Sequence, residues 1–354
     1  MATLQDEDGA LTEVRPEDAF DVAVVHRWLS ERLPDLVAPP AVLQYRGGQS
    51  NLTYLLHYPG QDLVLRRPPQ GKKAGSAHDM RREYEVQRLL RGPFARVCEV
   101  LAFGDDPAVL PEPFYVMRRV EGLILRSDLP PELDLSAAQT HELGLRIFDV
   151  LADLHSVDVD AAGLRFLWRG EGYVRRQVSG WSRRFRDAHT PDVPDGEDVM
   201  HWLDRRQPAD VAARMIHGDW RSDNLVLDPS MLAVTTVLDW ELSTVGDPLM
   251  DLGSALAYWV QADDDPDFQE LRFQPSNAPG MPTRAEIVAG YTARTGLDVG
   301  DWSFYEVFGL FRLAVVLQQI WYRYRAGQTT NPGFARFGPA VEHIIERCRR
   351  RLSD

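Results

Sequence analysis

Cysteine is scarce in this sequence, which has only Cys98 and Cys348 among its 354 residues. The two cysteines lie far apart, and neither belongs to a CxxC pair. A disulfide framework needs several cysteines, and a structural zinc site needs closely spaced pairs of ligands. The sequence therefore predicts neither of these, and its cysteine usage is typical of a reducing cytosol.

Positively charged residues are also fewer than negatively charged ones. The chain has 39 Lys and Arg residues against 53 Asp and Glu residues, which gives a formal net charge of -14 at pH 7. A protein whose main partner is DNA or RNA usually carries the opposite sign, because phosphate contacts supply most of that affinity. We therefore expect no nucleic-acid partner.

Long apolar runs are missing as well. The most apolar windows, such as 235–238 and 310–320, are short or are interrupted by Arg312 and Gln318. A membrane-spanning helix needs about 20 apolar residues. The first ten residues are acidic and polar, so no signal peptide is visible. These features predict a cytoplasmic protein with no membrane partner.

The first third of the chain has the pattern of a small sheet with helices. A helix is expected from about Asp21 to Leu33, where Pro34 ends it. Short strands separated by turns follow, at 42–45, 52–57, 63–66, 98–103 and 114–119. The charged helical stretch 78–91 can cover one face of their sheet.

After Glu121 and Gly122 the sequence becomes helical in character. Helices are expected at 136–155, 173–187, 249–260, 284–295, 302–324 and 340–352. A small β-rich part joined to a larger α-rich part is an α+β architecture. We place the two lobes at 1–117, with the leading helix, and at 118–354.

The strongest chemical pattern is HGDWRSDN at 217–224, followed by an apolar strand that ends in Asp239. Phosphoryl transfer needs an oriented hydroxyl and a divalent metal that neutralises the γ-phosphate. Asp219 can accept the hydroxyl proton, while Asn224 and Asp239 offer the hard oxygen ligands that Mg²⁺ prefers. The alternative is a surface turn with Asn224 as a cap. The strand that leads to Asp239 counts against it.

These residues resemble the aminoglycoside phosphotransferase and choline kinase-like family, relatives of protein kinases in which the first aspartate is the catalytic base. One branch is especially similar, the phosphotransferase domain found as bacterial single-domain proteins and fused to acyl-CoA dehydrogenases. The similar runs are GQSNLTY at 48–54, PFYVM at 113–117, LHSVD at 154–158 and LDWELST at 238–244. The resemblance covers residues 42 to 295 and implies a bilobal protein-kinase-like fold, with a helical substrate subdomain in the large lobe.

A glycine-containing turn joins the first two strands of the small lobe. It holds Gly47, Gly48, Ser50 and Asn51, and it matches neither the Walker loop nor GxGxxG. Two glycines and small polar side chains let backbone N–H groups approach phosphates. A plain hairpin turn is the alternative, but beside the catalytic loop we interpret these four residues as a nucleotide cover.

Arg66 stands where members of the family carry a phosphate-clamping cation, usually lysine. Arginine differs because it offers a planar fork rather than a point charge. Glu83 is the expected ion-pair partner, in preference to Glu85, and strand alternation directs Arg67 away from it.

The small lobe ends with an apolar strand at 114–117. The resemblance places the hinge there, so the backbone near Val116 and Met117 is expected to bind adenine. A strand that only contributes to the core is the alternative.

Two histidines and two aspartates are assigned supporting roles. His217 and His155 are expected to be architectural rather than acid–base groups. The resemblance suggests that Asp251 braces the catalytic loop through hydrogen bonds. Asp247, with Pro248 after it, fits a helix N-cap.

The substrate side is less defined by the sequence. A set of aromatic residues either lines a pocket or forms core: Phe166, Trp168, Tyr173, Trp181 and Phe185. The acidic run 263–267 with Glu270 either borders a site for a cationic substrate or is a solvated loop. The basic tail 347–351 is expected to be an exposed helix end.

The sequence thus predicts an ATP- and Mg²⁺-dependent phosphotransferase that acts on a hydroxylated small molecule. The branch resemblance favours a hydroxyacyl-CoA or a related compound, and an aminoglycoside or another antibiotic is the alternative acceptor. A nucleotide-binding pseudokinase is a different possibility, disfavoured because Asp219, Asn224 and Asp239 are all present. Protein kinase activity is disfavoured because no Ala-Pro-Glu follows Asp239. The oligomeric state and the choice between ATP and GTP stay open.

Overall fold

The computed structural model describes residues 10–46, 51–69 and 79–352. The chain divides into two compact units. The first contains residues 1–121 and 236–242, and the second contains 122–235 and 243–354. The lobes expected from the sequence, 1–117 and 118–354, lack this return of 236–242 to the first unit. The returning segment carries Asp239.

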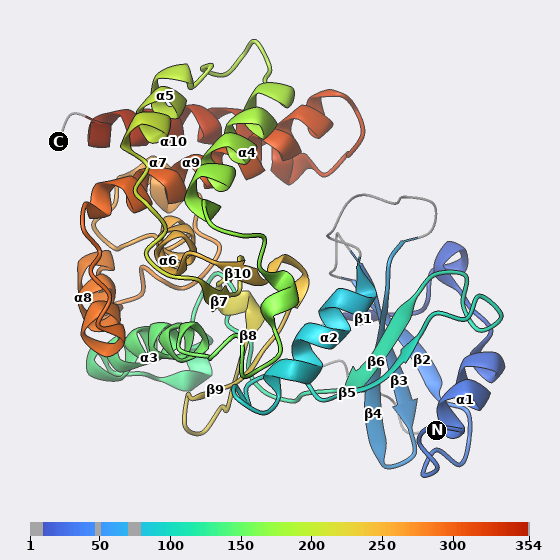
Figure 1. Ribbon diagram of the computed structural model, residues 1–354. Coiled ribbons are helices and arrows are strands. Elements are labelled where there is room, and N and C mark those ends of the chain that lie inside the picture. Colours follow the sequence, from blue (N-terminus) through green and yellow to red (C-terminus); the bar gives the residue numbers. More distant parts are fainter. Residues whose placement is uncertain (1–9, 47–50, 70–78, 353–354) are drawn as a thin grey trace. The chain divides into compact units, whose positions relative to one another are not determined.

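A six-stranded sheet is the centre of the first unit (Figure 1). Its strands lie in the order β1-β2-β3-β4-β6-β5, and each is antiparallel to its neighbours. The strands are β1 (Leu11–Thr12), β2 (Ala41–Tyr45), β3 (Leu52–Tyr58), β4 (Gln61–Arg67), β5 (Val100–Gly104) and β6 (Phe114–Arg118). All five strands expected from the sequence are present.

The two faces of this sheet are covered by different helices. Leu63 and Leu65 of β4 share a buried cluster with Trp28 of α1 (Val22–Ser30). Val64, between them, belongs to a second cluster with Met80 of α2 (Met80–Leu90). This alternation follows from the two-residue period of a strand, and it also decides where Arg66 and Arg67 point.

Helices make up most of the second unit. They are α3 (Ala137–His155), α4 (Tyr173–Asp187), α5 (Glu197–Arg206), α6 (Pro248–Ala257), α7 (Pro266–Gln269), α8 (Arg284–Thr295), α9 (Trp302–Arg325) and α10 (Phe337–Leu352). Two small pairs of strands accompany them. One is the antiparallel pair of β7 (Arg214–Ile216) and β10 (Thr244–Gly246), and the other pairs β8 (Leu225–Leu227) with β9 (Val234–Val237). Among the described residues, no helix has both the length and the apolar character of a membrane span.

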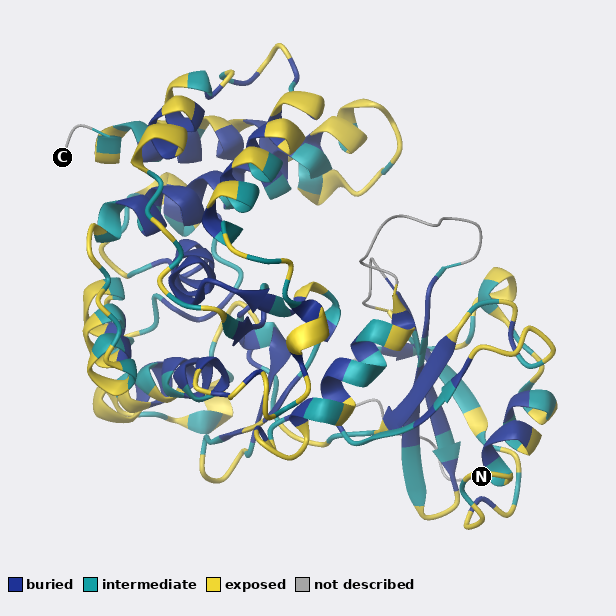
Figure 2. Ribbon diagram, in the orientation of Figure 1, coloured by how far each residue is buried: buried dark blue, intermediate teal, exposed yellow. Residues whose placement is uncertain are grey.

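Helix α9 forms the middle of the helical packing and is largely buried (Figure 2). It packs against α4, α5, α6 and α10. Its contact with α6 is very close at Gly309, where an added Cβ would lie 2.1 Å from the carbonyl oxygen of Gly253. Side chains larger than hydrogen cannot fit there without moving a backbone. This crossing fixes α6, which carries Asp251, against α9, which carries Arg312.

Candidate active site

A buried ion pair lies on the α2 side of the sheet in the first unit. Nη1 of Arg66 is 3.0 Å from Oε1 of Glu83, and the two side chains are 13% and 2% exposed. The predicted pairing of Arg66 with Glu83 is therefore present. Glu85 instead pairs with Arg88 on the helix surface. Arg67 points to the opposite face, where it donates hydrogen bonds to the hydroxyl of Tyr54.

Two further side chains hold Glu83 in place. The hydroxyl of Tyr115 donates to Oε1 of Glu83 at 2.8 Å, and Nε2 of Gln87 donates to the Tyr115 hydroxyl at 3.2 Å. Burial raises the pKa of Glu83, although the positive charge of Arg66 opposes this shift. For Arg66 burial acts to lower the pKa, but Glu83 and the other anionic neighbours raise it overall. Arg66 therefore keeps its charge.

Arg66 also reaches the segment that carries Asp239. Its Nη2 lies 3.4 Å from Oδ1 of Asp239 and 4.0 Å from Oε2 of Glu241. Asp239 has φ 60°, a left-handed conformation that is uncommon for a residue with a side chain. Strained backbone of this kind gathers at functional sites, where the surrounding structure enforces it. The segment thus presents the Asp239 carboxylate in a fixed direction.

Neighbouring residues anchor this segment within the first unit. Nδ2 of Asn51 donates to Oε2 of Glu241 at 3.0 Å, and Nη1 of Arg82 donates to the Glu241 carbonyl oxygen at 3.0 Å. The indole of Trp240 is fully buried, and its Nε1 donates to the carbonyl oxygen of Val237. Asn51, expected to cover the nucleotide, thus makes a structural contact with Glu241. Its expected partners in that role, Gly47, Gly48 and Ser50, lie outside the described residues.

Val116 and Met117 lie in the interior of β6, with β4 on one side and β5 on the other. Their main-chain groups face strands on both sides, so an adenine ring would compete with the sheet for these hydrogen bonds. The adenine contact near Val116 and Met117 stays a prediction.

The predicted catalytic loop of the second unit follows β7 and is braced by Asp251. The backbone N–H groups of His217 and Gly218 donate to the two carboxylate oxygens of Asp251, each at 2.9 Å. Nε2 of His155 lies 3.2 Å from Oδ2 of the same residue. This confirms the bracing role expected for Asp251. Asp247 caps α6, where it accepts hydrogen bonds from the N–H groups of Leu249 and Met250, also as expected.

Conformation and charge both support this arrangement. Gly218 has φ 84°, which a glycine adopts without strain. Burial alone would raise the pKa of Asp251, but hydrogen bonds from His155 and His217 lower it overall. His155 also contacts the hydroxyl of Tyr291 at 2.6 Å, and His217 is fully buried. Both histidines are architectural in the structure.

Asp219 presents its carboxylate beside Asn224. Nδ2 of Asn224 donates to the carbonyl oxygen of Asp219 at 2.9 Å and to its Oδ2 at 3.2 Å. This assignment directs the amide oxygen of Asn224 away from Asp219, where it can bind a metal ion. Nε of Arg221 lies 3.5 Å from Oδ1 of Asp219, and its Nη2 lies 2.9 Å from Oδ2 of Asp223. The structure thus brings Asp219 and Asn224 together in the second unit, and Arg66, Glu83 and Asp239 together in the first.

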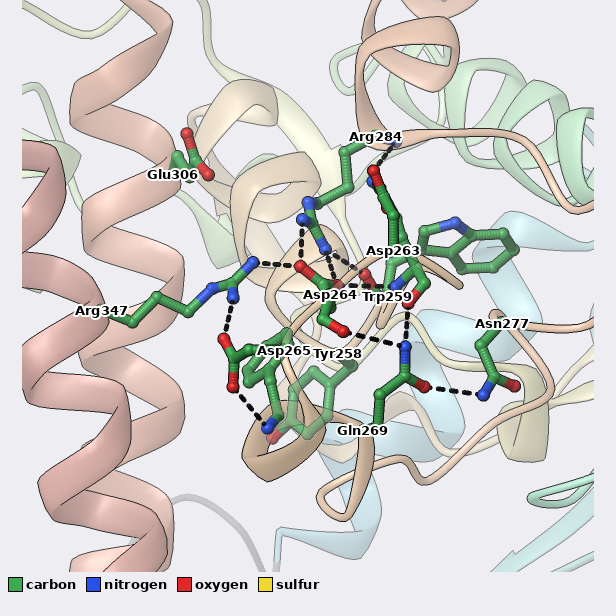
Figure 3. A network of polar contacts seen from close by, with 12 residues as sticks. Tyr258, Trp259, Asp263, Asp264, Asp265, Gln269, Asn277, Arg284, Glu306 and Arg347 are labelled. Atoms are coloured by element: carbon green, nitrogen blue, oxygen red, sulfur yellow. Dashed lines mark hydrogen bonds and ion pairs between the residues drawn. The ribbon is translucent and has the colours of Figure 1, made fainter.

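The acidic run is a solvated loop only in part, because Asp263, Asp267 and Glu270 are exposed whereas Asp264 and Asp265 are not. Asp264 is 5% exposed at its side chain and binds both Nη atoms of Arg284 at 2.7 and 2.8 Å, and it also pairs with Arg347 (Figure 3). Asp265 accepts from Arg347 at 3.0 Å. The run is therefore neither a free cation site nor a solvated loop at these positions, because arginines from α8 and α10 neutralise it. The expectation of a fully exposed basic tail is wrong for Arg347, which is 13% exposed.

The aromatic set divides between core and surface. Phe185 is fully buried and stacks near Phe311, so it belongs to the core. Phe166 is 56% exposed. Trp181 is half-buried, and the guanidinium groups of Arg184 and Arg312 lie over its ring in cation–π contacts. Sequence reasoning missed the arginine partner on α9, because nothing local links residue 312 to residue 181.

Comparison with known proteins places the chain among phosphotransferases. A family model described as the phosphotransferase enzyme family matches residues 41–287. Acyl-CoA dehydrogenase family member 11 from Gallus gallus is 35% identical over 348 residues, which are 95% of this chain but 44% of that protein. The chain therefore spans less than half the length of this relative.

Solved structures agree in fold. One from Ralstonia eutropha JMP134, described as a "putative aminoglycoside phosphotransferase", is 31% identical with a TM-score of 0.81, covering 95% of this chain and 99% of the other. The GDP complex of aminoglycoside 2'-phosphotransferase-IIIa is 16% identical with a TM-score of 0.58, covering 94% and 99%. The kinase-like α+β fold expected from the sequence is confirmed, and the chain belongs to the phosphotransferase enzyme family.

Proposed function

We propose that this protein transfers the γ-phosphate of ATP to a hydroxyl group of an acyl-CoA-type acceptor. The observation that carries the proposal is the loop at 217–224. There, Asp251 fixes the backbone before Asp219, and Asn224 holds the carboxylate from the other side. A carboxylate that is positioned but partly exposed suits the orientation and deprotonation of an attacking hydroxyl.

The other predicted site residues have matching roles. The amide oxygen of Asn224 and the carboxylate of Asp239 would each offer Mg²⁺ a hard oxygen ligand of the kind that it prefers. When bound, Mg²⁺ neutralises charge on the phosphates. Arg66, fixed by Glu83, would bind a phosphate oxygen through its planar fork. Asp219 would accept the proton of the acceptor hydroxyl as its oxygen attacks the γ-phosphorus, and ADP would leave.

The proposed acceptor is a hydroxyacyl-CoA or a related hydroxylated acyl compound. Its support is the similarity to acyl-CoA dehydrogenase family members, which contain a region similar to this chain within a longer protein. The pairing of Asp264 with Arg284 and Arg347 also counts against a site for a cationic antibiotic at this aspartate. A charge that is already paired adds little to the binding of a second cation.

An acceptor screen tests this function. The protein would be incubated with Mg²⁺ and ATP labelled at the γ-phosphate, together with hydroxyacyl-CoAs of several chain lengths and with a panel of aminoglycosides. Label in the hydroxyacyl products, absent with Asp219→Asn, supports the proposal. Transfer to aminoglycosides alone would replace the proposed acceptor, and an ATP-binding protein that labels nothing would indicate a pseudokinase.

A further inference from the structure

Helix α4 is strongly basic in a chain of net charge -14. Its 15 residues include five arginines and one aspartate. Two of the arginines are engaged locally: Arg176 donates to the carbonyl oxygen of Gly170, and Arg186 pairs with Glu197. Arg184 is different, because it lies on the ring of Trp181 with its guanidinium carbon 4.6 Å from the ring centroid.

A second cation lies on the same indole. The guanidinium carbon of Arg312, from α9, is 5.1 Å from the centroid of Trp181. The side chain of Trp181 is oriented by a hydrogen bond from its Nε1 to Gln177. Cation–π contacts with one tryptophan thus fix two arginines from two different helices.

The repulsion between these two cations is not offset within the described part of the chain. Neither Arg184 nor Arg312 forms an ion pair with a described carboxylate, whereas most other arginines of the second unit do. Burial, together with Arg183 and Arg312, lowers the pKa of Arg184. An anion that binds at this ring would offset the unpaired positive charge of the two guanidinium groups.

This pair of arginines is connected to the catalytic loop. Nη2 of Arg312 donates a hydrogen bond to the carbonyl oxygen of Gly218, the residue before Asp219. Burial and the negative charge of Asp219 raise the pKa of the Tyr258 hydroxyl. The positive charges of Arg221 and Arg312 oppose this rise. The cations and Asp219 therefore share one neighbourhood of the second unit.

We propose that Arg312, Trp181 and Arg184 form a binding site for an anionic group of the acceptor, a phosphate or a carboxylate, and so select an anionic acceptor over a cationic one. The inference rests on the proposed function. Guanidinium groups bind such oxyanions through paired hydrogen bonds, and the indole holds them in place before the anion arrives. Arg312 links this site to the backbone that presents Asp219.

Steady-state kinetics of Arg184→Gln test the site. Arg186→Gln is the matched control, because it removes the same charge from the same helix but breaks a pair with Glu197. With a hydroxyacyl-CoA, we expect Arg184→Gln to raise KM about tenfold, as for a lost hydrogen bond to a charged group, and to affect kcat less. Arg184→Glu should raise KM further. The control should stay within about twofold of wild type.

Truncated acceptors identify the anionic group. If Arg184 binds a CoA phosphate, the KM of the corresponding hydroxyacyl-pantetheine, which lacks the nucleotide phosphates, should not change in Arg184→Gln. If it binds a carboxylate, the KM of the free hydroxy acid should rise instead. Equal KM values for all acceptors in Arg184→Gln and Arg186→Gln would overturn the proposal.

Binding without turnover separates this inference from the proposed function. Calorimetric titration of CoA and of a free hydroxy acid into the Asp219→Asn protein requires no phosphate transfer. Binding that Arg184→Gln weakens and Arg186→Gln does not would support the anion site even if no acceptor is phosphorylated. If the wild-type protein phosphorylates acceptors but Arg184→Gln binds CoA and the hydroxy acid unchanged, the proposed phosphotransferase activity stands and the proposed anion site is refuted.

Discussion

Arg66 and Glu83 form a buried ion pair, with Nη1 and Oε1 3.0 Å apart, on the α2 side of the sheet in the first unit. The pair is coupled to function through the second Nη of Arg66, which lies 3.4 Å from Asp239. A lysine, which the family resemblance leads us to expect at this position, has one ammonium group and could not contact Glu83 and Asp239 in the same way. The arginine therefore joins the α2 side of the unit to the predicted metal ligand.

Replacing Arg66 tests this connection. We expect Arg66→Ala to destabilise the protein by about 3–5 kcal/mol, because it leaves the carboxylate of Glu83 buried without its cation. Arg66→Lys should cost less, about 1–2 kcal/mol, because it keeps the charge but loses the fork. Chemical denaturation of both variants measures the difference. Equal stabilities for the alanine and lysine variants would show that the charge of residue 66 does not matter.

The backbone at Asp239 gives a second prediction. At φ 60° a side chain is strained and glycine is not. We expect Asp239→Gly to be more stable than Asp239→Ala by about 1 kcal/mol, although both lack the carboxylate. Both should lose Mg²⁺-dependent phosphotransfer. An alanine variant more stable than the glycine variant, measured by denaturant unfolding, would contradict a left-handed residue 239.

Asp251 makes stability depend on pH. Its pKa is lowered in the folded protein, because hydrogen bonds from His155 and His217 outweigh its burial. A carboxylate with a lowered folded pKa stabilises the protein above its unfolded pKa of about 3.9 and loses that contribution as the pH falls through the folded value. We expect Asp251→Asn to cost about 3 kcal/mol at pH 7 and progressively less below about pH 4.

Thermal unfolding of wild type and Asp251→Asn between pH 7 and pH 3 measures this effect. Asp158→Asn is a suitable control, because Asp158 is exposed and accepts only from N–H groups of its own turn, at 3.0 Å. A stability difference for Asp251→Asn that stays constant across the whole pH range would mean that the ionised carboxylate is not what holds the loop.

The acidic run offers a comparison between adjacent residues. Asp264 is almost buried against Arg284 and Arg347, whereas Asp263 is exposed and accepts from Gln261. We expect Asp264→Asn to destabilise the protein by about 2–4 kcal/mol, because two buried guanidinium groups lose a shared partner, and Asp263→Asn to cost less than about 0.5 kcal/mol. If the two variants unfold at the same denaturant concentration, the pairing of Asp264 with Arg284 and Arg347 does not stabilise the protein as proposed.

Local patterns in the sequence predicted a large part of this protein. The two-residue period of β4 was enough to separate Arg66 from Arg67. Pro248 after Asp247 was enough to predict the helix cap, whereas the role of Asp251 came from the family resemblance. The motif from His217 to Asn224 predicted the family. These inferences succeed because strand alternation, capping and catalytic spacing are all encoded within a few residues.

Contacts between distant residues were not predictable in the same way. Asn51 and Glu241 are 190 positions apart, and Asp264 meets Arg347 across 83. The sequence around a single charged residue does not predict its distant partner, because the packing of whole helices determines which charges come into contact. For the same reason, the contact of Arg312 with the ring of Trp181 was not predicted. The acceptor side of the site depends on these contacts, and it was the part that the sequence defined least.

If Asp219 is the base for phosphoryl transfer, the Asp219→Asn variant should lose that transfer. Asparagine keeps the size of the side chain and can still contact Asn224, but it cannot accept the hydroxyl proton. With labelled ATP, Mg²⁺ and a hydroxyacyl-CoA, we expect a kcat lower by at least about 100-fold, with ATP affinity by calorimetry close to that of wild type. Full transfer by Asp219→Asn would contradict the role of Asp219 as the base.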